Sequence, residues 1–174
     1  MIFAVVGPSG AGKDTLLAGA LAQRPDLHIV RRVITRSAEA GGEPFEAVSE
    51  DAFQRRLEAG EFALDWHAHG LRYGIPKAQL ALPGDVVFNG SRAALAEARD
   101  RLPGLVVVLV TAPDDILAAR LAARGREDVE DIKARLARAS FTLPAGIVPR
   151  VVMNDASPEV GVARLLAALQ PDRG

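Results

Sequence analysis

Residues 1–17, MIFAVVGPSGAGKDTLL, decide the fold of this chain. An apolar run from Ile2 to Val6 enters GPSGAGK, and helix-forming residues follow. This order matches the pattern G-x-x-x-x-G-K of a phosphate-binding loop between a strand and a helix. The glycines let backbone N–H groups point into one concavity, which the positive end of the helix also faces. The alternative is a glycine-rich turn without a ligand. The predicted nucleotide contacts are Gly7, Pro8, Ser9, Gly10, Ala11, Gly12 and Lys13.

The residue after Lys13 is Asp14, where the pattern expects a hydroxyl that holds Mg²⁺. A carboxylate in the first turn of a helix is favourable by about 0.3–1 kcal/mol through the helix dipole alone. Mg²⁺ also prefers oxygen ligands, and Thr15 keeps a hydroxyl one position later. Both interpretations stay open, and Asp14 and Thr15 are the candidate metal ligands.

Length and composition predict a single domain, because 174 residues with 49% apolar composition suit one core. A net charge of −1 gives no overall basic field for nucleic acid or an anionic membrane, so we expect neither as a partner. The chain has no cysteine, which excludes disulfides, thiolate zinc sites and thiol nucleophiles. The first apolar run stops at Gly7 and no basic leader precedes it, so we expect a cytoplasmic protein. The sequence does not decide between a monomer and a homodimer.

Short apolar runs alternate with longer amphipathic segments along the chain, and several runs are continuously apolar, as in parallel strands covered on both faces. This alternation predicts an α/β fold of three layers, a P-loop NTPase fold with a central parallel sheet. Ser49 and Ser157 are typical helix N-caps, and Pro158 follows Ser157 at the first helical position. The expected strands are 2–6, 27–34, 85–88, 105–110 and 148–153, and the expected helices are 13–23, 92–101, 113–124 and 158–169.

Two stretches interrupt the alternation. After a polar loop at 37–45, residues 53–82 suggest a helix, a short strand, an aromatic loop and a short helix beside the sheet. Residues 120–138 contain a glycine flanked by arginines and then a charged amphipathic helix, which is typical of a mobile lid.

Several strings occur in the order of a known family: GPSGAGKD, VITR ending at Arg36, GGE at 41–43, LRYGIPKAQL and RLAARGRE. Over nearly its whole length the chain resembles the guanylate kinase-like P-loop kinases. The strings LDWHAHGLRYG, VVFNGSRAAL and RGREDVEDIKARLARA resemble, within that group, the ribose 1,5-bisphosphate phosphokinases. The resemblance implies five parallel strands, a lid at about 120–138 and an acceptor-binding region at about 37–82. It also implies phosphorylation of ribose 1,5-bisphosphate by ATP and Mg²⁺, giving phosphoribosyl pyrophosphate and ADP in phosphonate breakdown.

The resemblance extends only partly to the acceptor site of guanylate kinases. Arg36 matches the first phosphate-binding arginine and Tyr73 one of two tyrosines, but Glu39 and Phe45 stand in place of the other two. Asp65 matches one base-reading acid. Because Asn89 and Ser91 stand where the second acid is expected, a sugar bisphosphate suits the site better than GMP. The predicted substrate contacts are Arg36, Asp65, Tyr73, Asn89, Ser91 and Arg92.

Simpler interpretations exist for these residues. Asn89 and Ser91 suit a turn and N-cap after a strand, and Trp66 and Tyr73 suit ordinary packing. His67 and His69 would share one face of a strand, but zinc is disfavoured without a third ligand nearby. Arg31 and Arg32 suit a solvated strand edge.

Transfer to an ionised phosphate oxygen needs alignment and charge neutralisation rather than a general base. We therefore expect Lys13 and the lid arginines to be catalytic, namely Arg120, Arg124 and Arg135. Arg126 and Asn154 are candidate nucleotide contacts, Asn154 near the adenine as the resemblance implies. The alternative for the arginines is ion pairing with nearby acids, Glu127, Glu130 and Asp131.

Three rival functions remain open. A nucleoside monophosphate kinase would need the base-reading acids that are missing here. A guanylate kinase-like interaction module would tend to lose the ATP loop and lid arginines, which this chain keeps. An ATP-binding regulator would keep them without transferring a phosphoryl group.

Overall fold

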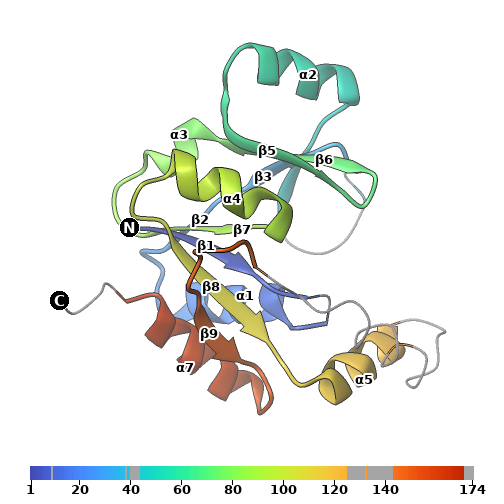
Figure 1. Cartoon of the computed structure of the whole chain (residues 1–174), viewed down its shortest axis with the longest axis vertical. Helices are drawn as coiled ribbons and strands as arrows, with labels where there is room; N and C mark the ends of the chain where they lie inside the picture. Colours follow the sequence, from blue (N-terminus) through green and yellow to red (C-terminus); the bar gives the residue numbers. More distant parts are fainter. Residues whose placement is uncertain (9, 38, 40–43, 125–131, 133–142, 171–174) are drawn as a thin grey trace. The chain divides into compact units, whose positions relative to one another are not determined.

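Two compact units make up the chain in a computed structural model that describes residues 1–8, 10–37, 39, 44–124, 132 and 143–170 (Figure 1). The first, the hairpin unit, comprises Met1–Ala4 and Arg24–Val106. The second, the loop unit, comprises Val5–Gln23 and Val107–Gly174. The predicted nucleotide contacts belong to the loop unit and the predicted acceptor contacts to the hairpin unit.

The central sheet has five strands in the order β2-β7-β1-β8-β9. β2 pairs with β7, and β8 with β9, in parallel. The residues Phe3 to Val6 are all fully buried, which explains the unbroken apolar run of β1. The predicted parallel α/β fold is therefore confirmed. The strands are β1 (Ile2–Val6), β2 (His28–Ile29), β7 (Val86–Asn89), β8 (Val106–Thr111) and β9 (Arg150–Met153).

Three helices of the loop unit are α1 (Lys13–Gln23), α5 (Asp114–Arg124) and α7 (Pro158–Ala168). α1 and α7 pack closely against each other because glycine leaves room at the contact. A Cβ at Gly19 would lie 2.5 Å from Val162 Cγ2, and one at Gly161 would lie 2.7 Å from Leu16 Cδ2. Ser157 caps α7 as predicted, since its hydroxyl accepts a hydrogen bond from the Val160 N–H.

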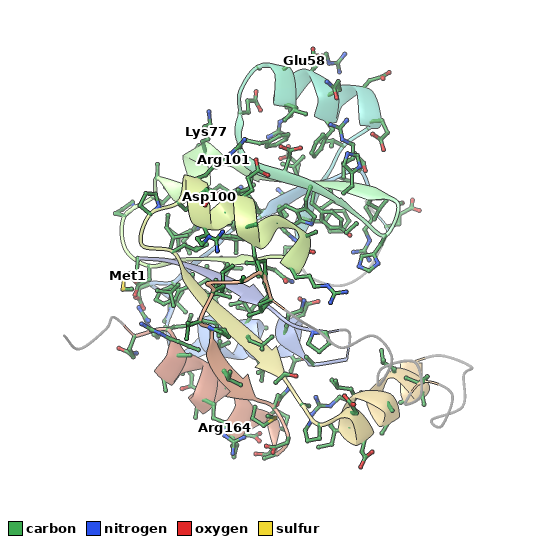
Figure 2. All side chains as sticks on the ribbon, viewed as in Figure 1. Met1, Glu58, Lys77, Asp100, Arg101 and Arg164 are labelled. Carbon is green, nitrogen blue, oxygen red and sulfur yellow. The ribbon has the colours of Figure 1, made fainter. Side chains whose placement is uncertain are left out.

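A second sheet, in the hairpin unit, has the strand order β4-β3-β6-β5. Phe53 of α2 is fully buried against Val33 and Phe62, and the two phenylalanine ring centroids are 4.8 Å apart. α4 packs against β5, where Arg101 Nη1 donates to the Ala63 carbonyl at 3.0 Å (Figure 2). The elements are β3 (Arg32–Ile34), β4 (Phe45–Ala47), α2 (Glu50–Glu58), β5 (Phe62–Ala68), β6 (Leu71–Pro76), α3 (Lys77–Leu80) and α4 (Arg92–Arg101).

The single strand predicted over 27–34 is wrong, because this stretch forms β2 in one sheet and β3 in the other. The side chain of Gln79 explains the break at Arg31. Its Oε1 accepts from the Arg31 N–H at 2.7 Å, and its Nε2 donates to the Arg31 carbonyl at 2.9 Å. Since one side-chain amide satisfies both backbone groups, Arg31 needs no strand partner, and the chain passes from one sheet to the next.

The predicted aromatic loop is also wrong, because β5 and β6 form an antiparallel hairpin through this segment. His69 and Gly70 make its turn with φ values of +53° and +74°, as a two-residue type I′ turn requires. His67 lies in β5 and His69 in the turn, so the two do not share a strand face. The described residues contain no group of three His, Cys, Asp or Glu side chains that could hold a metal ion.

Most of the predicted lid, 120–138, lies outside the described residues, including Arg126 and Arg135. Its first part forms the end of α5, and Ile132 is buried. None of the helices within the described ranges is long and apolar enough to cross a membrane.

Candidate active site

The loop between β1 and α1 has a backbone shape that requires glycine. Gly10 and Gly12 have φ values of +85° and +87°, in the left-handed region where a Cβ is strained. Gly7 has no room for one, since its Cβ would lie 2.0 Å from the Val110 carbonyl oxygen. A Cβ at Gly12 would lie 2.6 Å from Asn154 Nδ2. Each of the three glycines therefore has a steric or conformational reason to stand where the pattern places it.

The backbone donors of the loop lead directly into α1. The Ala11 N–H donates to the Pro8 carbonyl at 3.2 Å and closes a turn. The first hydrogen bond of the helix runs from the Leu16 N–H to the Gly12 carbonyl at 3.1 Å. The amides of residues 13–15 therefore precede the helical ladder, at the positive end of the helix dipole. Lys13 is half-buried there, and the side chains of Asp14 and Thr15 are exposed. This donor set suits a polyphosphate, and two exposed oxygen-bearing side chains suit a hydrated Mg²⁺ ion.

The carbonyl side of the loop is held by two further predicted residues. Arg120 of α5 donates from Nη1 to the carbonyls of Gly10 at 3.2 Å and Ala11 at 3.4 Å, and from Nη2 to the Asn154 carbonyl at 2.7 Å. Asn154 follows β9 and is 7% exposed. Its Nδ2 donates to the Ala11 carbonyl at 2.7 Å. The structure therefore brings Arg120 and Asn154 to the predicted phosphate loop, on the side of its carbonyl groups.

Aromatic and arginine side chains lie against each other in the second sheet of the hairpin unit. Tyr73 is 8% exposed and stacks on Trp66, with ring centroids 5.4 Å apart and planes 3° apart. The Arg32 guanidinium lies 5.0 Å from the Tyr73 ring centroid. Arg36 lies 5.2 Å from the ring centroid of Phe45, which pairs with Arg32 in the strand register. The predicted contacts Arg36 and Tyr73 are thus both held by cation–π or stacking contacts.

The remaining predicted acceptor contacts come from β5 and from the end of β7. Asp65 is half-buried and pairs with Gly74 across the hairpin. Asn89 ends β7 and is 6% exposed, whereas Arg92 is exposed at the first position of α4. The Ser91 hydroxyl accepts from the Ala93 N–H at 3.3 Å and caps α4. The N-cap part of the turn-and-cap interpretation is confirmed at Ser91, whereas Asn89 is the last residue of the strand rather than part of a turn. A substrate role for these side chains stays a prediction.

Two arginines in the second sheet were not predicted as part of any site. Arg32 is half-buried, so its interpretation as a solvated edge is wrong. Arg72 lies 4.5 Å from the Phe53 ring centroid, and its Nη1 donates to Gln54 Oε1 at 2.9 Å. The sequence signal for the partial burial of Arg32 is its position two residues before Ile34, which is buried. Residues two apart in a strand lie on the same face. Of the predicted nucleotide and catalytic contacts, Ser9, Arg126 and Arg135 lie outside the described residues, and Arg124 ends α5.

Solved structures that superpose on this chain include two kinases. A guanylate kinase from Anaplasma phagocytophilum superposes with a TM-score of 0.68 over 97% of this chain and 84% of that one, at 17% sequence identity. A sugar kinase from Janibacter sp. superposes with a TM-score of 0.54 over 97% and 93%, also at 17% identity. At this identity the likeness establishes the fold alone.

Sequence relatives are much closer, although no family model matches the chain. A protein of Ruegeria sp. named ribose 1,5-bisphosphate phosphokinase PhnN is 47% identical over 177 residues, covering 99% of this chain and 93% of the relative. A protein of the same name from Pseudomonas fluorescens is 54% identical, covering 79% and 76%. A bifunctional ribose 1,5-bisphosphokinase-thymidine phosphorylase of Cupriavidus necator is 49% identical over 97% of this chain, which spans 29% of that relative's length. Because the match to the Ruegeria protein runs along almost the whole of both chains, this chain belongs to the ribose 1,5-bisphosphate phosphokinase family.

Proposed function

We propose that the protein transfers the γ-phosphoryl group of ATP to ribose 1,5-bisphosphate, giving 5-phosphoribosyl 1-diphosphate and ADP, in the breakdown of phosphonates. The observation that carries this proposal is the glycine loop before α1, whose shape suits a polyphosphate, in a chain of this family. The family supports the choice of acceptor, since the Ruegeria relative is named for it.

The acceptor atom in this reaction is an oxygen of the 1-phosphate group. A phosphate monoester has a second pKa near 6, so this oxygen carries charge at neutral pH and needs no general base. A bond forms between this oxygen and the γ-phosphorus as the bond from the γ-phosphorus to the bridging oxygen breaks, and ADP leaves with that electron pair. The protein has to align the two phosphates and reduce their mutual repulsion.

On the donor side, the amides of the loop and the Lys13 ammonium would hold the β- and γ-phosphates. The predicted nucleotide contacts in this stretch are Gly7, Pro8, Ser9, Gly10, Ala11 and Gly12. Asp14 and Thr15 are exposed in the first turn of α1 and would hold Mg²⁺ directly or through water. When bound, Mg²⁺ neutralises charge on the β- and γ-phosphate oxygens.

On the acceptor side, Arg36 and Arg92 would bind phosphate groups, and the Tyr73 hydroxyl would donate a hydrogen bond. Asn89, Ser91 and Asp65 have the amide, hydroxyl and carboxylate groups that ribose hydroxyls can bond. Such a set leaves guanine without its second carboxylate partner, and an unpaired buried polar group is costly. GMP should therefore be a poor acceptor.

The lid arginines Arg124, Arg126 and Arg135 would supply further positive charge to the transferring group. A guanidinium stays charged at every physiological pH and donates in a planar fork that suits phosphate oxygens. Closure of such a lid would exclude water and so suppress ATP hydrolysis. We also expect the protein to act in the cytoplasm, as a monomer or a homodimer.

The test is ADP release by the purified protein with ATP and Mg²⁺, comparing ribose 1,5-bisphosphate, GMP and no acceptor, with the product identified by mass. Turnover with the sugar bisphosphate alone is expected. Turnover with GMP alone would favour a nucleoside monophosphate kinase. Activity with neither acceptor, together with ATP binding, would favour a regulator or a binding module.

A further inference from the structure

We propose that Arg120 and Asn154 are positioning residues that hold the phosphate loop from its carbonyl side and so keep its N–H groups turned toward the nucleotide. The inference rests on the proposed function of this loop as the ATP site. It gives both residues a role different from the phosphate and adenine contacts that their positions in the sequence suggest.

The two faces of the loop have opposite needs. Peptide N–H and C=O groups point in opposite directions, so a loop that turns N–H groups toward a ligand turns carbonyls toward the protein. Buried carbonyls need donors. Gly10 is buried and Ala11 is 1% exposed, so water cannot serve their carbonyls freely. The Ala11 carbonyl accepts from both Asn154 Nδ2 and Arg120 Nη1.

Arg120 connects the loop to two other elements through one planar group. Arg120 is a residue of α5, and its guanidinium donates to the carbonyls of Gly10, Ala11 and Asn154. Both terminal nitrogens are therefore directed at backbone carbonyls. A guanidinium has five N–H donors, and these three bonds place both terminal nitrogens of Arg120 on the carbonyl side of the loop.

The Asn154 side chain fits closely between its neighbours, so its size and shape matter as well as its hydrogen bond. Its backbone N–H donates to the Thr111 carbonyl at 2.7 Å, which continues the β8–β9 ladder by one residue. Its side chain lies between two glycines: a Cβ at Gly12 would be 2.6 Å from Nδ2, and a Cβ at Gly161 would be 2.6 Å from Oδ1. An aspartate would keep this shape, lose the donor and place a carboxylate oxygen against the Ala11 carbonyl.

Positioning of the loop and contact with the transferring group predict different effects on ADP binding. The loop holds the phosphates of ATP and ADP alike. Loss of the supporting hydrogen bonds should therefore weaken the binding of ADP and of ATP to a similar degree. Loss of an arginine that contacts only the transferring group should lower kcat and leave ADP binding unchanged.

The experiment measures dissociation constants of ADP and ATP with Mg²⁺ by calorimetry for Arg120→Gln, Asn154→Asp and the double variant. Arg164→Gln is the matched control, because Arg164 Nη1 donates to the Met153 carbonyl at 2.6 Å, one residue before Asn154, from the α7 position labelled in Figure 2. We expect each single variant to bind both nucleotides about tenfold more weakly. The double variant should lose less than the product of the two effects, because both residues bond Ala11. The control should stay within about twofold of wild type, as expected for a site outside the network.

An Arg120→Gln variant that binds ADP as wild type does but turns over slowly would overturn the inference in favour of direct phosphate contact. Thermal unfolding of each variant separates a displaced loop from a destabilised fold. Arg120→Lys, which keeps the charge and one donor group, should restore part of the affinity. The calorimetry contains no acceptor, so its result does not depend on which acceptor the protein uses. A wild-type protein that binds ADP but does not phosphorylate ribose 1,5-bisphosphate would therefore contradict the proposed acceptor and leave this inference intact. A wild-type protein that binds no nucleotide would contradict both.

Discussion

The glycine loop before α1 and the second sheet, the two predicted phosphate sites, are built in different ways. The loop depends on backbone: two left-handed glycines, the first turn of α1 and two side chains behind the carbonyls. The second sheet depends on side chains from separate strands, with Arg32 on Tyr73, Tyr73 on Trp66, and Arg36 on Phe45. A site made of backbone groups is encoded by one short stretch of sequence. A site made of side chains from several strands depends on how those strands pair. The first is therefore easier to predict and harder to alter without loss.

The largest expected effect is a loss of activity on substitution of the loop lysine. Lys13→Met should lower kcat/KM by orders of magnitude, because it removes the charge that we propose neutralises the transferring phosphate. Lys77→Met is the matched control, since Lys77 is exposed at the start of α3, far along the chain from the loop (Figure 2). Steady-state kinetics with both substrates checks this, and equal losses in the two variants would contradict it.

A second change tests whether the loop depends on space as well as on conformation. Gly12→Ala brings the cost of a positive φ, about 1–2 kcal/mol, together with a collision against Asn154 Nδ2. Gly104→Ala has the same conformational cost at φ +80° but meets nothing within 4 Å. We expect the two variants to lose stability to different degrees in urea unfolding, and only Gly12→Ala to weaken nucleotide binding. Similar affinity for ADP in both would show that the contact with Asn154 does not matter.

A smaller effect belongs to the second sheet. Tyr73→Phe keeps the stack on Trp66 and removes one hydroxyl, so KM for ribose 1,5-bisphosphate should rise about three- to tenfold, the worth of one hydrogen bond. KM for ATP should stay unchanged and serves as the internal control. An unaltered acceptor KM would mean that Tyr73 only packs.

The smallest effect belongs to the Arg24–Asp26 ion pair of the hairpin unit. Arg24 donates to Asp26 Oδ2 at 2.7 Å, and this hydrogen bond lowers the pKa of Asp26 below its ordinary 3.8. A lowered folded pKa stabilises the protein above the unfolded value and loses that contribution as pH falls through the folded value. Asp26→Asn should therefore be slightly less stable than wild type at neutral pH, and the two should converge in acid. Urea unfolding at several pH values checks the trend, which a constant difference down to the acid limit would contradict.

Prediction from sequence succeeded where local signals decide the structure. The glycine pattern and its flanks predicted β1 and α1 with their observed bounds, and Ser49 and Ser157 predicted two helix caps. It failed where distant residues decide. No residue near Arg31 in the sequence indicates that the side chain of Gln79, far along the chain, forms hydrogen bonds with the Arg31 backbone. These bonds divide the expected strand. The hairpin turn was missed because His69 is not a common turn residue, although histidine tolerates a positive φ better than most.

The same limit applies to the candidate site. The sequence predicted Arg120 and Asn154 as site residues but gave no indication of the side of the loop they face, since donors to carbonyls and donors to phosphates are the same residue types. Only the folded positions of α5 and of the end of β9 distinguish the two roles. The predicted acceptor contacts are spread over β5, β6, the ends of β3 and β7 and the start of α4, so their common purpose stays a prediction.

One measurement tests the central claim most directly: the position of the transferred phosphoryl group. The protein is incubated with Mg²⁺, ribose 1,5-bisphosphate and ATP labelled with ¹⁸O in its γ-phosphoryl group, and the product is examined by ³¹P NMR and mass spectrometry. The account predicts the label in the terminal phosphate of a 1-diphosphate, with a diphosphate coupling in the spectrum. Label in a new phosphomonoester on a ribose hydroxyl, or label recovered only in inorganic phosphate, would contradict it.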